Sequence, residues 1–145
     1  MLSTHIATQI YAKICFAPTS GQKKIIEMLS EYLADDDFSR IFVLNGYAGT
    51  GKTTLIAALV GALKALGIKP VLLAPTGRAA KVLSQYASEP ALTIHKRIYR
   101  ERTNAEYESR FSLGLNTERG AIFIVDEASM LADGEQAGAD RKSVV

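Results

Sequence analysis

The sequence predicts an α/β fold in which helices cover a mostly parallel sheet, and three observations support this class. Residues 41–44, 70–74 and 121–125 are short apolar runs that suit buried strands. Residues 54–66 carry a helical apolar pattern between the first two runs, which predicts a strand–helix–strand unit with parallel strands. The chain has 145 residues, of which 48% are hydrophobic, so one domain with a sizeable core is expected.

Charge and cysteine content narrow the function classes only slightly. The net charge of +2, from 17 basic and 15 acidic residues, neither requires nor excludes a nucleic-acid partner. Cys15 is the only cysteine, so no internal disulfide can form, and its apolar neighbours suggest a core position. No apolar run reaches membrane-spanning length, and polar residues interrupt the N-terminal segment as they would not in a signal peptide. We therefore expect a cytoplasmic protein.

Two amphipathic helices are expected before the first strand. Isoleucines spaced four apart predict a helix over about residues 4–15, which Pro18 ends. Either Thr19 or Ser20 is expected to cap the second helix. The apolar side of that helix should consist of Ile25, Met28, Leu29, Tyr32 and Leu33. Gly67 is expected to end the later helix that precedes the strand at 70–74.

A glycine-rich loop joins the first strand to the helix after it. Its residues are Gly46, Tyr47, Ala48, Gly49, Thr50, Gly51, Lys52 and Thr53. Glycines allow successive backbone N–H groups to point into one concavity, which opens at a helix N-terminus and so favours an anion. Lys52 can reach the outer phosphates of a nucleotide, and the Thr53 hydroxyl can ligate Mg²⁺. The alternative is a turn that binds nothing, but strand, loop and helix in this order favour a phosphate-binding P-loop.

An acidic pair follows the apolar run 121–125. Asp126 can hold Mg²⁺ through its bound water, and Glu127 can activate the water that attacks a γ-phosphate. Exposed charges in a turn are the alternative, which the P-loop upstream disfavours. The sequence therefore predicts ATP and Mg²⁺ as ligands, with Lys52, Asp126 and Glu127 as the catalytic residues.

Two segments are candidates for contact with nucleic acid. Thr76 and Arg78 follow the strand at 70–74, at the edge of a parallel sheet where ligands bind. They could hold a phosphate backbone. Alternatively, Thr76 is only a helix cap and Arg78 only a surface charge. Four basic residues gather further on, namely Lys96, Arg97, Arg100 and Arg102. A solvated helix face is the preferred explanation of that cluster, and a nucleic-acid footprint is the alternative. Residues 101–119 are expected to form a surface loop, with a hairpin as the alternative.

Several segments together resemble a known family. Residues 46–54, 74–80, 93–96 and 125–130 resemble motifs I, Ia, Ib and II of the first RecA-like motor domain in RecD-like helicases of superfamily 1. Residues 19–22 resemble the Q motif of such proteins, in which the glutamine reads the adenine. The Pro-Thr-Gly-Arg-Ala-Ala and Asp-Glu-Ala-Ser sequences are the most specific parts of this resemblance.

The resemblance implies a three-layer α/β/α P-loop NTPase fold that is RecA-like and incomplete at its C-terminus. It divides the chain into an N-terminal helix (1–18), an ATP-binding domain (19–131) and an irregular tail (132–145). It implies ATP hydrolysis coupled to translocation on single-stranded DNA in the intact protein. The implied ATP-binding residues are Gln22, Gly46, Tyr47, Ala48, Gly49, Thr50, Gly51, Lys52, Thr53 and Thr54; the metal ligands are Thr53 and Asp126; and the DNA-binding residues are Thr76, Arg78, Thr93 and His95.

The sequence also departs from this family pattern. Such helicases use a third motif, a second RecA-like domain and an arginine from that domain, for which the residues after Met130 leave no room, so slow turnover is expected from this chain alone. Family members place a later strand between the P-loop strand and the Asp126 strand. Residues 132–145 contain no apolar run, so we expect this position to be empty and the open strand edges to promote self-association.

Two other functions stay open at this stage. A small P-loop kinase would need a lid, for which residues 100–119 are the candidate, although the adjacent Asp126 and Glu127 suit water activation better. A module that binds nucleotide without turnover is the second alternative.

Overall fold

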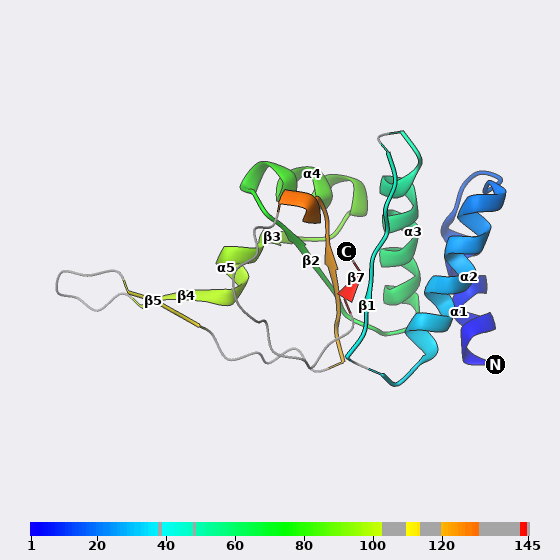
Figure 1. Ribbon diagram of the computed structural model, residues 1–145, viewed down its shortest axis with the longest axis horizontal. Helices are drawn as coiled ribbons and strands as arrows, with labels where there is room; N and C mark the ends of the chain where they lie inside the picture. Colours follow the sequence, from blue (N-terminus) through cyan, green and yellow to red (C-terminus); the bar gives the residue numbers. More distant parts are fainter. Residues whose placement is uncertain (38, 48, 103–109, 114–119, 131–142, 145) are drawn as a thin grey trace.

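A parallel five-stranded sheet in the order β1–β7–β6–β2–β3 is central to the computed structural model, and a separate two-stranded sheet pairs β4 with β5 (Figure 1). The structure describes residues 1–37, 39–47, 49–102, 110–113, 120–130 and 143–144. The strands are β1 (Ile41–Phe42), β2 (Pro70–Ala74), β3 (Ala91–Thr93), β4 (Tyr99–Arg102), β5 (Arg110–Leu113), β6 (Ile122–Val125) and β7 (Ser143–Val144). The helices are α1 (Leu2–Lys13), α2 (Ser20–Ala34), α3 (Lys52–Ala65), α4 (Gly77–Ala87) and α5 (Ile94–Ile98), with a 3₁₀ turn η1 (Ala128–Met130). None of the helices in the described ranges is long and apolar enough to cross a membrane.

Helices α1 and α2 confirm the predicted N-terminal pair, but two side chains are not where the pattern placed them. Thr19 caps α2 as expected. Met28 is 50% exposed, whereas Ile26 is fully buried, because the side of α2 that packs against α1 is one step away from the predicted stripe. Cys15 is exposed rather than in the core, since α1 already ends at Lys13.

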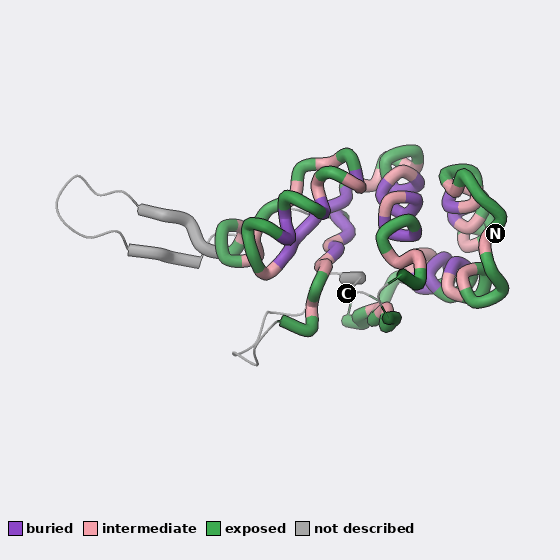
Figure 2. The backbone as a smooth tube through the Cα atoms, turned by 90° about the horizontal axis from the view of Figure 1, so that it is seen from above, coloured by how far each residue is buried: buried purple, intermediate pink, exposed green. Residues whose placement is uncertain are grey.

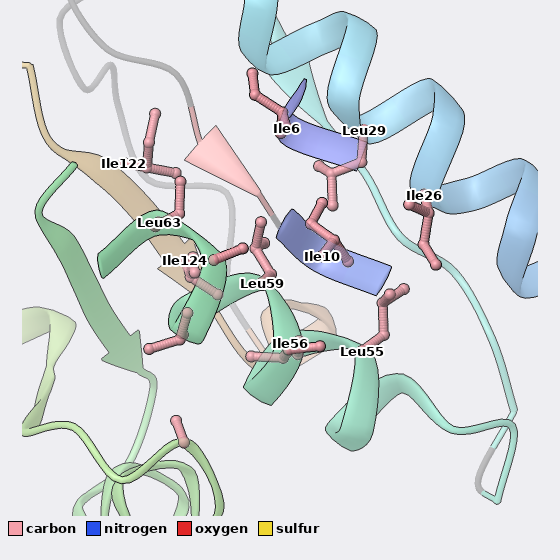
Figure 3. Packing of buried hydrophobic residues seen from close by; sticks show 14 of the residues in the cluster. Ile6, Ile10, Ile26, Leu29, Leu55, Ile56, Leu59, Leu63, Ile122 and Ile124 are labelled. Atoms are coloured by element: carbon pink, nitrogen blue, oxygen red, sulfur yellow. The ribbon is translucent and has the colours of Figure 1, made fainter. Parts of the chain in front are cut away.

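The main hydrophobic core surrounds helix α3, which lies between the α1–α2 pair and the sheet (Figure 3). Leu59 and Leu63 of α3 are almost completely buried, and Ile122 and Ile124 of β6 belong to the same cluster. Burial is concentrated where these elements face each other (Figure 2). A helix that is apolar on several sides is expected in such a position, since neighbours cover it from more than one direction.

The predicted glycine stop at the end of α3 is confirmed. Gly67 adopts a left-handed conformation with φ of 72°. Its N–H donates to the carbonyl of Lys64 at 3.1 Å, and the N–H of Ile68 donates to the carbonyl of Leu63 at 2.9 Å. These two bonds form a Schellman motif, which directs the chain out of the helix and toward β2.

Strand β2 is buried along its whole length, as predicted, because it has neighbours on both faces. Leu72 faces the main core. Val71 and Leu73 form a smaller cluster with Ala121 on the opposite face, and Ile94 of α5 packs against that cluster. This alternation along β2 is what a strand covered on both faces requires.

The prediction that residues 41–44 form a buried strand is wrong in part. Ile41 and Val43 are each 61% exposed, whereas Phe42 and Leu44 pack against the main core. The physical reason is that successive side chains of an extended segment point to opposite faces, and the main core covers only the face of Phe42 and Leu44. The ring of Tyr32 lies 5.5 Å from that of Phe42 and covers the inner face.

The expected gap between the P-loop strand and the Asp126 strand is not present. A strand from later in the chain does lie between them, but it is β7, from within the supposedly irregular tail. Val144 pairs in parallel with Phe42 on one side and with Ile124 on the other. Strand pairing needs only backbone N–H and C=O groups, so two residues without an apolar pattern can occupy this position. The predicted self-association through a central gap therefore has no basis in this structure.

The hairpin alternative for residues 101–119 is confirmed for the part of that segment that the structure describes. β4 and β5 are antiparallel, and the register pairs Arg100 with Ser112 and Arg102 with Arg110. The hairpin projects away from the sheet and its covering helices (Figure 1). Residues 103–109 and 114–119 lie outside the described ranges.

Candidate nucleotide-binding site

A cleft of about 480 Å³ separates the loop after β1 from the end of β6. Gly46 and Lys52 contribute to one side of it, which we call the glycine-rich wall (residues 46–53). Asp126 and Glu127 contribute to the other side, which we call the acidic wall. The fold therefore brings together the two motifs that the sequence separates by about half its length.

The glycine-rich wall has a backbone that only glycine adopts readily. Gly49 and Gly51 have φ of 80° and 82°, in the left-handed region, and Gly51 is the residue that precedes α3. At Gly46 the reason for glycine is space, because a Cβ there would lie 2.8 Å from Oγ1 of Thr50. The Thr50 hydroxyl donates to the carbonyl of Tyr47 at 2.7 Å and so closes the loop on itself. Ala48 lies outside the described residues.

Lys52 is the cation of this wall. It is half-buried at the first position of α3, and its Nζ donates to the carbonyl of Gly46. Thr53 and Thr54 follow on the same first turn, and both are exposed. A positive side chain next to a helix N-terminus attracts anions, so this wall is suited to phosphate groups.

Gln22 reaches the glycine-rich wall from α2. A Cβ at Gly51 would lie 2.5 Å from the Gln22 amide nitrogen, so the two residues are adjacent. The amide oxygen of Gln22 accepts from the Thr19 N–H at 2.9 Å, and the Gln22 N–H donates to the Thr19 hydroxyl at 3.2 Å. This reciprocal pair is a capping box, a role that the Thr19-x-x-Gln22 spacing could have revealed. A second cleft, of about 270 Å³, lies beside Gln22 and Gly51 and is also lined by Tyr47, which is 90% exposed.

The acidic wall is held by contacts with distant parts of the chain. The Asp126 N–H donates to the carbonyl of Leu73 at 3.0 Å, which extends the pairing of β6 with β2. Oδ1 of Asp126 accepts from the Glu127 N–H at 3.0 Å, and Oδ2 accepts from the Tyr86 hydroxyl at 2.5 Å. Glu127 is exposed and has φ of 55°, an unusual conformation for a residue other than glycine. Strained conformations of this kind often occur at functional sites.

Tyr86 is a member of the site that sequence reasoning missed. It belongs to α4 and is half-buried. Burial raises the pKa of its hydroxyl well above the usual value, and the hydrogen bond to Asp126 and the negative charges of Asp126 and Glu127 raise it further. The hydroxyl therefore remains a hydrogen-bond donor at neutral pH. Because 40 positions separate Tyr86 from Asp126, no local pattern could have paired them.

The four residues proposed for DNA lie where β2 and β3 end. Ala74 pairs with Thr93, so the two strands end at the same edge of the sheet. Thr76 and Thr93 both act as helix caps: Oγ1 of Thr76 accepts from the Ala79 N–H at 3.2 Å, and Oγ1 of Thr93 accepts from the Lys96 N–H at 3.1 Å. The cap explanation of Thr76 is thus observed, and each hydroxyl retains its own proton for another acceptor. Arg78 and His95 are exposed at the same edge.

Of the two predicted Mg²⁺ ligands, Asp126 lines the cleft, whereas Thr53 is exposed next to Lys52 on the first turn of α3 and is not among the lining residues. Within the part of the chain that the structure describes, no group of three or more histidine, cysteine, aspartate or glutamate side chains could form a metal site by itself. The predicted donors are one hydroxyl, from Thr53, and one carboxylate, from Asp126. Mg²⁺ in nucleotide sites typically takes one or two protein ligands and completes its coordination with phosphate oxygens and water.

Comparison with known proteins places this fold and cleft in a family. Residues 19–138 match the family model described as an AAA domain. The chain is 30% identical over 116 residues to the ATP-dependent RecD2 DNA helicase of Deinococcus radiodurans. The aligned residues make up 80% of this chain and 16% of that protein. It is 37% identical over 78 residues to the ATP-dependent DNA helicase dda of Enterobacteria phage T4, covering 53% of this chain and 17% of the phage protein.

A third relative is an uncharacterized protein of Methanocaldococcus jannaschii, which is 32% identical over 120 residues, or 75% of this chain and 10% of the archaeal protein. The chain therefore spans less than a fifth of the length of each of these relatives. The predicted α/β P-loop fold is confirmed by the family match, which extends from α2 beyond the acidic wall. The chain belongs to the AAA domain family, and its similarity to the RecD2 and dda proteins identifies it as a RecD-like segment of superfamily 1.

Proposed function

We propose that the chain is the ATP-binding motor segment of an ATP-dependent DNA helicase, in which ATP hydrolysis drives translocation along single-stranded DNA. One observation carries this proposal: the glycine-rich wall and the acidic wall line the same cleft. Two relatives whose names describe ATP-dependent DNA helicases support it.

Each wall has a separate task in this proposal. The N–H groups of residues 46–53 and the Lys52 side chain bind the phosphates of ATP, with Thr54 on the same turn and Gln22 beside the loop. Glu127 accepts a proton from the attacking water, and its exposed position allows that contact. Thr53 and Asp126 would hold Mg²⁺, which, when bound, supplies positive charge that offsets the charge of the phosphates.

The DNA strand would lie along the edge where β2 and β3 end. Arg78 and His95 are exposed there, and the Thr76 and Thr93 hydroxyls can donate to phosphate oxygens while they cap their helices. Contacts of this kind position the strand without reading its bases.

A calorimetric titration with ATP and Mg²⁺ tests the nucleotide part of this proposal. Lys52→Ala removes the side-chain cation of the glycine-rich wall, so we expect a loss of at least tenfold in ATP affinity, since charge-assisted hydrogen bonds contribute about 1.5–3 kcal/mol. Lys24→Ala is the matched control, because Lys24 is an exposed lysine on α2 and its loss should leave the affinity unchanged. Equal affinities in Lys52→Ala and the parent chain would contradict the P-loop assignment.

A further inference from the structure

The Asp126 carboxylate is oriented by two hydrogen bonds of different origin. The Glu127 N–H, next to it in the chain, donates to Oδ1 at 3.0 Å. The Tyr86 hydroxyl, from α4, donates to Oδ2 at 2.5 Å. A carboxylate held through one oxygen can still turn about its side-chain bonds, whereas donors on both oxygens define the plane of the group. Tyr86 therefore supplies the second constraint on the orientation of this side chain.

Helix α4 presents the Tyr86 hydroxyl from a well-anchored position. Leu83 and Ala87 of α4 are buried in the main core on either side of Tyr86 in sequence. The Thr76 cap holds the beginning of the helix. Just beyond its end, Glu89 forms an ion pair with Lys64 of α3 at 2.6 Å. The hydroxyl is thus placed by the core and not by a mobile surface segment.

We propose that Tyr86 is a positioning residue for the divalent cation site, whose hydroxyl holds the Asp126 carboxylate in the orientation that binds the cation. This inference rests on the proposed function, in which Asp126 contributes to a Mg²⁺ site. Groups that hydrogen-bond to a metal-binding side chain typically change metal affinity by about 10- to 100-fold when they are removed. Tyr86 acts only through Asp126 and is not itself a ligand.

The Mn²⁺ affinity of the full 145-residue chain, in the presence of a non-hydrolysable ATP analogue, measures this effect directly. The electron paramagnetic resonance signal of free Mn²⁺ reports how much of the metal is bound. Tyr86→Phe removes one hydroxyl and should weaken Mn²⁺ binding about tenfold. Its affinity for the same analogue without divalent metal should not change. Tyr32→Phe is the matched control: it removes a hydroxyl that donates to the Arg40 carbonyl at 2.9 Å, and because neither residue lines the cleft, Mn²⁺ affinity should stay unaltered.

A second variant separates the hydrogen bond from general packing. Tyr86→p-aminophenylalanine keeps the ring and places an N–H donor where the hydroxyl was, so it should restore most of the Mn²⁺ affinity. If it binds Mn²⁺ as weakly as Tyr86→Phe does, the hydrogen bond is not the cause and the inference is overturned. Parental Mn²⁺ affinity in Tyr86→Phe also overturns it.

Asp126→Asn in the same titration distinguishes failure of the inference from failure of the proposed function. If Asp126→Asn weakens Mn²⁺ binding and Tyr86→Phe does not, the metal site stands and the role of Tyr86 is refuted. If Asp126→Asn binds Mn²⁺ like the parent, Asp126 is not a metal ligand, and the inference falls together with that part of the proposed function.

Discussion

The glycine-rich wall is held by hydrogen bonds between near neighbours in the chain, whereas the acidic wall is held by hydrogen bonds with residues 40 or more positions away. In the first, the Thr50 hydroxyl bonds to Tyr47 and Lys52 to Gly46. In the second, Asp126 depends on β2 through Leu73 and on α4 through Tyr86. Changes within the glycine-rich wall should therefore act locally, and changes in the core should disturb mainly the acidic wall.

The largest expected effect concerns the chemistry of the acidic wall. Glu127→Gln in a longer protein that carries this segment should keep ATP affinity and lower the hydrolysis rate by about 10²–10⁴-fold, because the amide cannot accept the proton from water. Steady-state phosphate release measures it, with Glu27→Gln, an exposed position on α2, as the control. An unchanged rate would show that Glu127 does not activate the water.

The next effect tests the burial pattern of the core, which includes the strand that leads into the acidic wall. Leu63→Ala removes a fully buried side chain of α3 from the cluster that contains Ile122 and Ile124, and should lower the free energy of unfolding by about 2–5 kcal/mol. Met28→Ala, on an exposed side of α2, should change it by no more than about 0.5 kcal/mol. Urea denaturation compares the two, and similar losses would mean that the burial pattern described for α2 and α3 is wrong.

Removal of β7 tests the strand that separates the two walls. Deletion of residues 143–145 removes backbone hydrogen bonds to β1 and β6, at about 1 kcal/mol each, and exposes two strand edges. We expect a lower melting temperature and concentration-dependent association in sedimentation velocity. Deletion of residue 145 alone keeps the observed pairing and serves as the control. If the shortened chain stays monomeric and keeps the parental melting temperature, the pairing of β7 with β1 and β6 is contradicted.

A smaller effect separates two glycines within the glycine-rich wall. Gly49→Ala and Gly51→Ala both place an alanine at positive φ, which costs about 1–2 kcal/mol. Only at Gly51 would the new Cβ also meet Gln22, whereas the space around Gly49 is open. Calorimetry should therefore show weaker ATP binding in Gly51→Ala than in Gly49→Ala, and the reverse order would contradict the observed contact.

The smallest effect lies outside both walls, at the edge proposed for DNA. Arg78→Ala should weaken binding of single-stranded oligonucleotides of any sequence. The slope of log affinity against log salt concentration should fall by about 1, because one phosphate contact is lost. Lys81→Ala removes an exposed charge further along α4 and should have less effect. Fluorescence anisotropy at several salt concentrations compares them. A preference for duplex DNA, or equal losses in both variants, would count against this edge as the path of the strand.

Features that depend on short stretches of chain could be predicted from the sequence. Positive φ at Gly49, Gly51 and Gly67, the Thr19 cap and the fully buried β2 follow from steric freedom, capping and hydrophobicity of neighbouring residues. These interactions act over a few positions, so they leave a pattern in the sequence. The succession of strand, glycine-rich loop and helix could be predicted for the same reason.

Which distant groups meet depends instead on how the helices and strands pack together. The exposure of Ile41 and Val43 depends on which face of this segment the core covers. The insertion of β7 depends on backbone pairing that any two residues can supply, and the bond from Tyr86 to Asp126 depends on how α4 packs against the core. Such contacts are selected by the free energy of the whole fold, so residues far apart carry no local sign of them.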